Sequence, residues 1–161
     1  KEFNMATIKK PSETVYGPTD KKISKADKKL YDLGKEVYFR EALCVTCHQA
    51  DGKGLDPAFP SLAKSPWVTD DAERLIKLTL YGLMGPLEVN GKKYDGQVPM
   101  TPFGGLLKDE ELAAVLTFVR NSFGNEAAPI QAADVQNVRA KNPGRVMLYH
   151  TEELLKEHPL K

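Results

Sequence analysis

Two cysteines and a histidine stand together in the run Cys44-Val45-Thr46-Cys47-His48, and their spacing suits covalent attachment of a haem. The Cys-x-x-Cys-His pattern is typical of c-type haem sites. Two thiols can add across the two vinyl groups of one haem, because the two intervening residues let the chain reach from one vinyl to the other. The histidine that follows would lie beneath the iron as its ligand. The motif therefore predicts one haem c, bound covalently through Cys44 and Cys47, with His48 as a metal ligand.

Two other kinds of site use the same cysteine spacing. A dithiol redox centre usually lies between a strand and a helix of a βαβ unit, whereas here a helical pattern precedes the motif and a glycine-rich loop follows it. A zinc site would need further ligands, but the chain has no other cysteine, and His150 and His158 lie far along the chain near its C-terminus. Both alternatives are weaker than haem attachment.

A second candidate ligand, Met100, lies in the run Gln-Val-Pro-Met-Thr-Pro-Phe at residues 97–103. A thioether is soft and uncharged, so a methionine opposite a histidine stabilises Fe(II) over Fe(III). Pro99 and Pro102 flank the methionine and stiffen the backbone, which limits movement of the ligand when the iron changes oxidation state. Phe103 follows as a candidate haem contact. We therefore predict His48 and Met100 as the axial pair.

Three alternatives to ligation by Met100 stay open. Methionine is more often a gap-filling core residue. Met84, in a Gly-Leu-Met-Gly run, is the main rival ligand, and His150 is a more distant one. If no thioether binds, the iron would be five-coordinate and the protein could bind or sense a small gas. A dihaem peroxidase is disfavoured, because it needs a second Cys-x-x-Cys-His motif, which this sequence lacks.

Length and charge restrict the class of protein. The chain has 161 residues, enough for one domain with a core and additional tails. Its 23 basic and 22 acidic residues give a net charge of +1, so electrostatics favour neither nucleic acid nor an anionic membrane as the main partner. No apolar run approaches the length that spans a bilayer, so we expect no transmembrane segment.

The chemistry of haem attachment predicts a location. Ligation of this type is completed on the outer side of an energised membrane, so we expect a periplasmic or otherwise exported protein. The first residues, Lys1-Glu2-Phe3-Asn4, lack the apolar region of a signal peptide. We therefore interpret the sequence as a mature or recombinant fragment, which leaves open a larger fused parent chain.

Three stretches have helical periodicity and could position these residues. The first begins after the N-cap Ser24 and ends near residue 40. The second follows Pro-Trp-Val and is expected to begin at Thr69 or Asp70, with acidic residues in its first turn. The third covers residues 109–123 and has the strongest apolar face.

The segments outside these helices also carry local signals. Asn90-Gly91 between two short extended runs predicts a small β-hairpin. Residues 1–24 are rich in Lys, Pro, Ser and Thr without apolar periodicity, and are expected to form an extended arm, either frayed or lying across the domain. Residues 125–161 form a C-terminal extension with two short helical patterns, either a packed tail or a linker to a larger partner.

Taken together, the sequence resembles a class I bacterial cytochrome c of the kind found as a partner or fused module of periplasmic dehydrogenases and reductases. Gly34 and Tyr38 match positions of that family's N-terminal helix, which pack across the C-terminal helix. Val115 and Phe118 match the positions that they cross. The resemblance covers residues 25–124, which we take as the haem domain.

The resemblance implies further haem contacts. Pro60 falls twelve residues after His48, where the family places a proline whose carbonyl accepts the Nδ1–H of the ligand histidine. Leu62 matches a position that lines the haem face. Trp67 could reach a haem propionate or could equally be a core aromatic. Tyr94 could also reach a propionate, but the role we favour for it is a hairpin aromatic that covers the core.

The sequence thus predicts an all-α cytochrome c fold with three to four helices around one covalent haem and a small β-hairpin insertion. The implied function is one-electron transfer rather than enzymatic catalysis, since an iron ligated on both sides has no open position. The implied partners are redox proteins such as a dehydrogenase, a reductase or a terminal oxidase.

Overall fold

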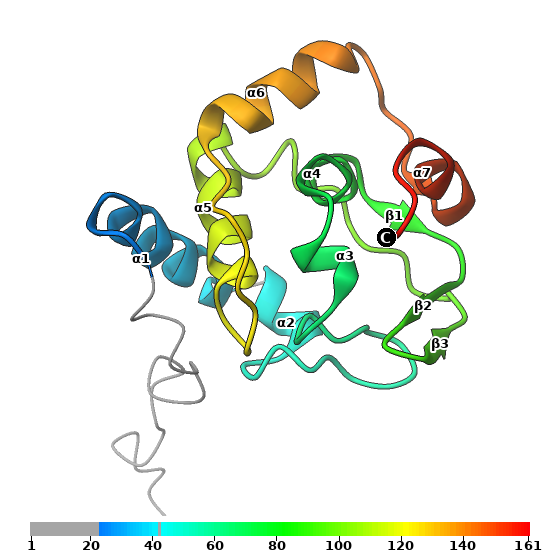
Figure 1. Ribbon diagram of the computed structural model, residues 1–161. Coiled ribbons are helices and arrows are strands. Elements are labelled where there is room, and N and C mark those ends of the chain that lie inside the picture. The colour runs from blue at the N-terminus through cyan, green and yellow to red at the C-terminus, as the bar shows by residue number, and fades with distance from the viewer. Residues whose placement is uncertain (1–22, 42) are drawn as a thin grey trace, which may run out of the picture.

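The computed structural model describes residues 23–41 and 43–161, in which helices surround a single apolar core (Figure 1). The predicted arm at residues 1–24 therefore lies almost entirely outside the described residues. No helix in the described part of the chain is both long enough and apolar enough to cross a bilayer. The elements are α1 (Lys25–Phe39), α2 (Cys44–His48), α3 (Pro66–Thr69), α4 (Ala72–Tyr81), β1 (Leu83–Met84), β2 (Leu87–Val89), β3 (Lys92–Tyr94), α5 (Asp109–Arg120), α6 (Ala132–Lys141), β4 (Tyr149–His150) and α7 (Thr151–Glu157).

The crossing of α1 and α5 forms the centre of the fold. An ideal Cβ at Gly34 would lie 1.9 Å from the carbonyl oxygen of Ala114, so only glycine lets the two helices approach this closely. Tyr38 packs against Phe118 with ring centroids 5.3 Å apart. Phe118, one of the two predicted crossing residues, therefore meets both Gly34 and Tyr38, and Val115 lines the cleft beneath the helix.

The second predicted helix is interrupted. Pro66 occupies the first turn of the short helix α3, where its fixed φ and missing N–H suit a helix start, and this helix ends at Asp70. The longer helix α4 then begins afresh, with Asp71 as its N-cap accepting a hydrogen bond from the Arg74 N–H at 3.1 Å. The prediction of Thr69 or Asp70 as the cap is therefore wrong by one or two residues.

The predicted hairpin is confirmed. Strands β2 and β3 pair antiparallel, with Val89 opposite Lys92. Asn90 and Gly91 between them have φ of 53° and 79°. Positive φ at both central residues is the geometry that a two-residue turn of this kind requires, and Asn-Gly adopts it readily.

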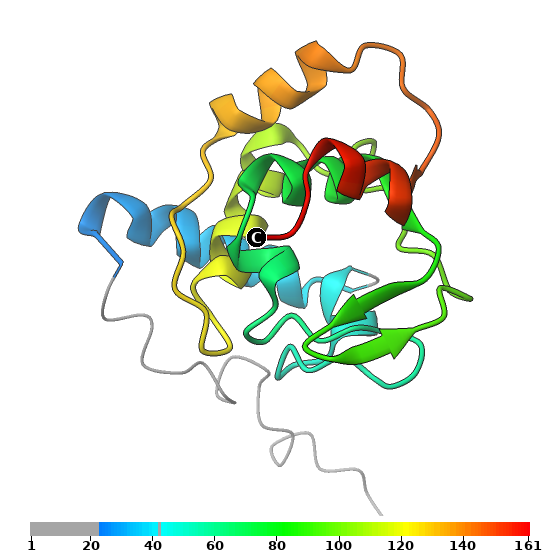
Figure 2. The ribbon, with the colours of Figure 1, turned by 45° about the vertical axis from the view of Figure 1, so that its right-hand side comes forward.

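The C-terminal extension packs on the helices of residues 25–124. It leaves α5, forms α6 along the outside of the helices, and returns so that α7 lies beside α4 (Figures 1 and 2). Strand β4 pairs in parallel with β1, with Tyr149 opposite Leu83. Both short helices were expected from the sequence, whereas this strand pairing was not.

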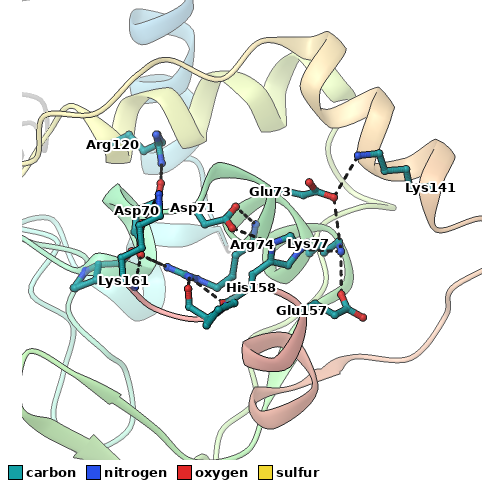
Figure 3. Close-up of polar contacts among 12 residues, drawn as sticks. Asp70, Asp71, Glu73, Arg74, Lys77, Arg120, Lys141, Glu157, His158 and Lys161 are labelled. Carbon is teal, nitrogen blue, oxygen red and sulfur yellow. Dashed lines mark hydrogen bonds and ion pairs between the residues drawn. The ribbon is translucent and has the colours of Figure 1, made fainter.

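A polar cluster fastens the end of the chain to α4 (Figure 3). The guanidinium of Arg74 is fully buried and donates to the carbonyl oxygens of His158 and Pro159 at 3.1 and 3.2 Å. His158 Nδ1 lies 2.9 Å from a carboxylate oxygen of Asp71, and its Nε2 lies 2.9 Å from Nζ of Lys77. The buried cation is thus satisfied mainly by backbone carbonyls of the chain end.

This cluster predicts an acid-sensitive part of the stability. Burial would raise the pKa of Asp71, but hydrogen bonds from the Arg74 N–H and from His158 outweigh it and hold that pKa below its ordinary value. The native state then binds fewer protons than the unfolded state, so this contribution is present above about pH 4 and is lost as the pH falls through the lowered pKa.

Asp71→Asn keeps the helix cap but removes the charge. We expect the variant to be about 1 kcal/mol less stable than the parent at pH 7, with the difference shrinking as the pH falls below about 4. Urea denaturation at several pH values measures this. A difference that persists undiminished at pH 3 would contradict the electrostatic explanation.

Candidate haem-binding site

The attachment motif forms the short helix α2 beside α1. Helical geometry places residues three and four apart on one face, so Cys44, Cys47 and His48 project to the same side. All three line the larger of two adjoining hollows, and Cys44 and His48 line the smaller one as well. The motif therefore presents two thiols and an imidazole to one cleft.

His48 is buried and oriented by a backbone contact. Its Nδ1 lies 2.9 Å from the carbonyl oxygen of Pro60, as the twelve-residue spacing predicts. Burial lowers the pKa of His48, and the hydrogen bond to Pro60 opposes that effect only in part. The ring is therefore neutral at pH 7, with its proton on Nδ1 and its Nε2 lone pair free to bind a metal.

A glycine makes the His48–Pro60 contact possible. Gly54, whose N–H donates to the His48 carbonyl at 3.0 Å, has φ of 69°. An ideal Cβ there would lie 2.2 Å from the carbonyl oxygen of Phe59 and 2.6 Å from that of Pro60. The loop can therefore fold back over His48 only with glycine at this position.

The two thiols do not have the character of a redox dithiol. Burial raises the pKa of Cys44 to about 11, and burial also raises the pKa of Cys47. Dithiol redox centres instead work through a thiolate whose pKa is lowered by its surroundings. The thiols of this site are neutral at pH 7 and face an apolar cleft, which suits addition to a vinyl group.

The zinc alternative also fails. Within residues 23–41 and 43–161, no three His, Cys, Asp or Glu side chains gather closely enough to hold a metal ion. His158 belongs to the polar cluster at the chain end. His150 Nδ1 accepts the Glu152 N–H at 3.3 Å and so caps α7. Neither histidine lies with the cysteines.

The cleft above α2 is apolar and large. Its inner hollow encloses about 670 Å³ and its outer hollow about 1150 Å³, including space open to solvent. Sites for organic cofactors are typically clefts of this order with apolar walls and few polar groups. The walls of the inner hollow include Leu62, Trp67, Leu75, Leu78, Val115 and Val119. A flat apolar macrocycle fits these walls and this donor set.

Met100 forms part of the wall of both hollows. Its N–H donates to the Leu83 carbonyl at 2.8 Å, and its carbonyl accepts the Leu83 N–H at 3.2 Å. The rival Met84 lines only the outer hollow and is 45% exposed. Met100 is therefore better placed than Met84 to act as a ligand in this cleft.

The remaining predicted contacts also reach the cleft. Leu62 and Trp67 line the inner hollow, and Tyr94 and Phe103 line the outer one. The Trp67 indole N–H, however, donates to the Glu88 carbonyl at 3.1 Å, and the Tyr94 hydroxyl donates to an Asp56 carboxylate oxygen at 2.9 Å. Their polar groups are therefore engaged within the protein, which favours the core interpretation over propionate binding.

Sequence reasoning missed several wall residues. Leu78 and Val119 line the inner hollow, and Leu43, Ala58 and Leu106 line the outer one. The periodic apolar faces of α4 and α5 could have identified the first two as buried. Nothing in the periodicity separates a side that faces a cofactor from a side that faces another helix.

The fold and the cleft define a c-type haem protein. Residues 31–123 match the cytochrome c family, and the chain belongs to that family. It therefore carries covalent haem c, for which Cys44 and Cys47 are the attachment residues, and it functions in electron transfer. When bound, the haem supplies a reversible Fe(II)/Fe(III) couple.

The relatives include proteins named as cytochromes and proteins named as cytochrome subunits of dehydrogenases. Cytochrome c-552 of Thermus thermophilus is 39% identical over 117 residues, covering 67% of this chain and 85% of that protein. The cytochrome c subunit of a quinone-dependent alcohol dehydrogenase from Gluconobacter oxydans is 36% identical over 110 residues, covering 67% of this chain and 22% of that subunit. The gluconate 2-dehydrogenase cytochrome c subunit of Pantoea cypripedii is 35% identical over 136 residues, covering 81% and 30% respectively.

Proposed function

We propose that this protein carries single electrons between periplasmic redox partners, using one haem c with His48 and Met100 as axial ligands. The observation that carries the proposal is that both residues line the same two hollows. His48 is held there by Pro60, and Met100 by its backbone pairing with Leu83. An iron bound on both sides offers no position to a substrate, so the protein acts as a carrier rather than an enzyme.

A dehydrogenase is the partner that we propose. Support comes from the relatives named as cytochrome subunits of alcohol, fructose and gluconate dehydrogenases. Around the outer hollow, Met84, Val98 and Leu106 are 45, 49 and 66% exposed. A small apolar rim of this kind suits the transient docking of an electron carrier. The periplasmic location is proposed from the chemistry of haem attachment, as in the sequence analysis.

Replacing Met100 by alanine tests the axial pair. We expect the ferric holoprotein to lose its weak near-infrared sulfur-to-iron band, and the ferrous form to bind carbon monoxide readily. The reduction potential should fall by on the order of 0.2 V, because loss of the thioether destabilises Fe(II), and axial ligation spans about 0.8 V in all. Near-infrared absorption and potentiometric titration measure these changes.

Met84→Ala is the matched control and should keep the band and the potential, since Met84 lines only the outer hollow. A parent protein that lacks the band and already binds carbon monoxide would contradict the proposal. That result would favour a five-coordinate haem that binds or senses a gas.

A further inference from the structure

Strand β1 has only two residues, and both of its edges are occupied. On one edge Leu83 exchanges two backbone hydrogen bonds with Met100, at 2.8 and 3.2 Å. On the other edge the Tyr149 N–H donates to the Gly82 carbonyl at 3.0 Å, and the Thr151 hydroxyl donates to the Met84 carbonyl at 3.0 Å. A strand this short has little stability alone. The C-terminal extension therefore helps to set the position of the backbone to which Met100 is bonded.

The three segments are also in contact where β1 begins. An ideal Cβ at Gly82 would lie 2.7 Å from the Met100 carbonyl oxygen and 2.9 Å from Cγ of Leu148. The methionine loop and Leu148, the residue preceding β4, therefore both pack against Gly82. At this packing density a shift of β4 displaces β1, and a shift of β1 displaces Met100.

A second part of the extension holds the other end of the methionine loop. Arg139 on α6 donates to the Gly104 carbonyl at 3.0 Å, and its Nε donates to an Asp109 carboxylate oxygen at 2.6 Å. The Gly104 N–H in turn donates to the Leu80 carbonyl at 3.0 Å. The loop from Met100 to Gly104 is thus fixed at the methionine through β1 and at Gly104 through Arg139.

The extension is anchored well enough to act as a fixed support. Tyr149 and Leu154 are fully buried, and Thr151 is 4% exposed. Beyond α7, the buried guanidinium of Arg74 donates hydrogen bonds to backbone carbonyls of the chain end (Figure 3). These contacts lie on α4 and involve no residue of the methionine loop.

We propose that the C-terminal extension holds Met100 in its ligating position, with Thr151 and Arg139 as positioning residues. The inference rests on the proposed ligation by Met100. If the extension supports Met100, the fraction of ferric protein in which the methionine has left the iron is smaller than it would be without that support. Imidazole added in solution binds only to that population, so its apparent affinity rises in proportion to the detached fraction.

The experiment measures imidazole binding to the ferric holoprotein in Thr151→Val, Arg139→Gln and the double variant. Thr151→Val removes the hydrogen bond to the Met84 carbonyl, beside the Leu83 that pairs with Met100, and Arg139→Gln removes the one to the Gly104 carbonyl at the end of the methionine loop. Each should therefore tighten imidazole binding about threefold to tenfold, and the double variant more. The pH at which the near-infrared band disappears should fall in the same order. Glu157→Gln is the matched control, because it removes a partly exposed ion pair with Lys77 but no hydrogen bond to β1 or to the methionine loop, and it should leave imidazole affinity unchanged.

The outcomes separate this inference from the proposed function. If the parent protein lacks the near-infrared band and binds imidazole as tightly as Met100→Ala does, the proposed ligation by Met100 is contradicted. A parent with the band, whose Thr151 and Arg139 variants bind imidazole as the parent does, would overturn the role of the extension alone. An equal rise in imidazole affinity in all variants, Glu157→Gln included, would also overturn it, because a general loosening of the protein would then explain the effect.

Discussion

Adding one methyl group at Gly34 is expected to lower the free energy of unfolding by about 3 kcal/mol. The new Cβ would lie 1.9 Å from the Ala114 carbonyl oxygen and 2.8 Å from Cβ of Phe118, both on α5. A backbone oxygen cannot be moved aside by a change of rotamer, so α1 and α5 must separate. The higher helix propensity of alanine offsets only about 1 kcal/mol. Chemical denaturation of Gly34→Ala holoprotein should show a lower midpoint.

Gly105→Ala is the matched control, since it adds the same methyl group where no heavy atom lies within 4 Å. Its stability should stay within about 0.5 kcal/mol of the parent. A Gly34→Ala protein as stable as this control would show that the two helices can move apart freely. The close crossing would then be a consequence of glycine rather than a requirement of the fold.

The features that could be predicted from the sequence depend on local chemistry. Asn90-Gly91 determines its own turn because both residues tolerate positive φ. The α1 and α5 helices are visible from apolar periodicity. The contact between His48 and Pro60 follows from a fixed spacing shared with the family, and the structure has it at 2.9 Å.

The helix starts show where local chemistry becomes ambiguous. The sequence predicts Thr69 or Asp70 as the cap, and the residue types alone do not separate these from the neighbouring Asp71, because Thr and Asp are both good N-cap residues. The structure selects Asp71, whose carboxylate also meets His158 from the end of the chain. The helix thus begins at the residue that also contacts His158, 87 positions further along the chain.

The extension could not be placed from the sequence for a related reason. Strands β1 and β4 have two residues each, too few for any alternation to appear. The Thr151 hydroxyl and the Met84 carbonyl that it binds are 67 positions apart. Arg74 looks like a solvated helix residue, yet it is fully buried because, besides the Asp70 carboxylate, its partners are backbone carbonyls, which leave no trace in the residue types. Such pairings depend on the tertiary fold alone.

Removing both attachment thiols is expected to remove the cofactor. In a Cys44→Ala/Cys47→Ala variant, made with haem-ligation machinery, no sulfur remains to add to the vinyl groups. The purified chain should be colourless after denaturation and have the mass of the bare polypeptide. It should also be much less stable, because the apolar walls of both hollows lose the group that covers them and binding no longer favours the native state.

A single cysteine substitution tests whether one sulfur alone can hold the haem. Cys47→Ala retains Cys44, which lines both hollows, and should keep one thioether and therefore covalent haem at reduced yield. Thr46→Ala is the matched control, since Thr46 stands between the cysteines and is exposed, and it should yield holoprotein of full mass. Intact-mass spectrometry of denatured protein distinguishes all three. Covalent haem in the double variant would show that another side chain forms the bond, and the assignment of α2 as the attachment site would be wrong.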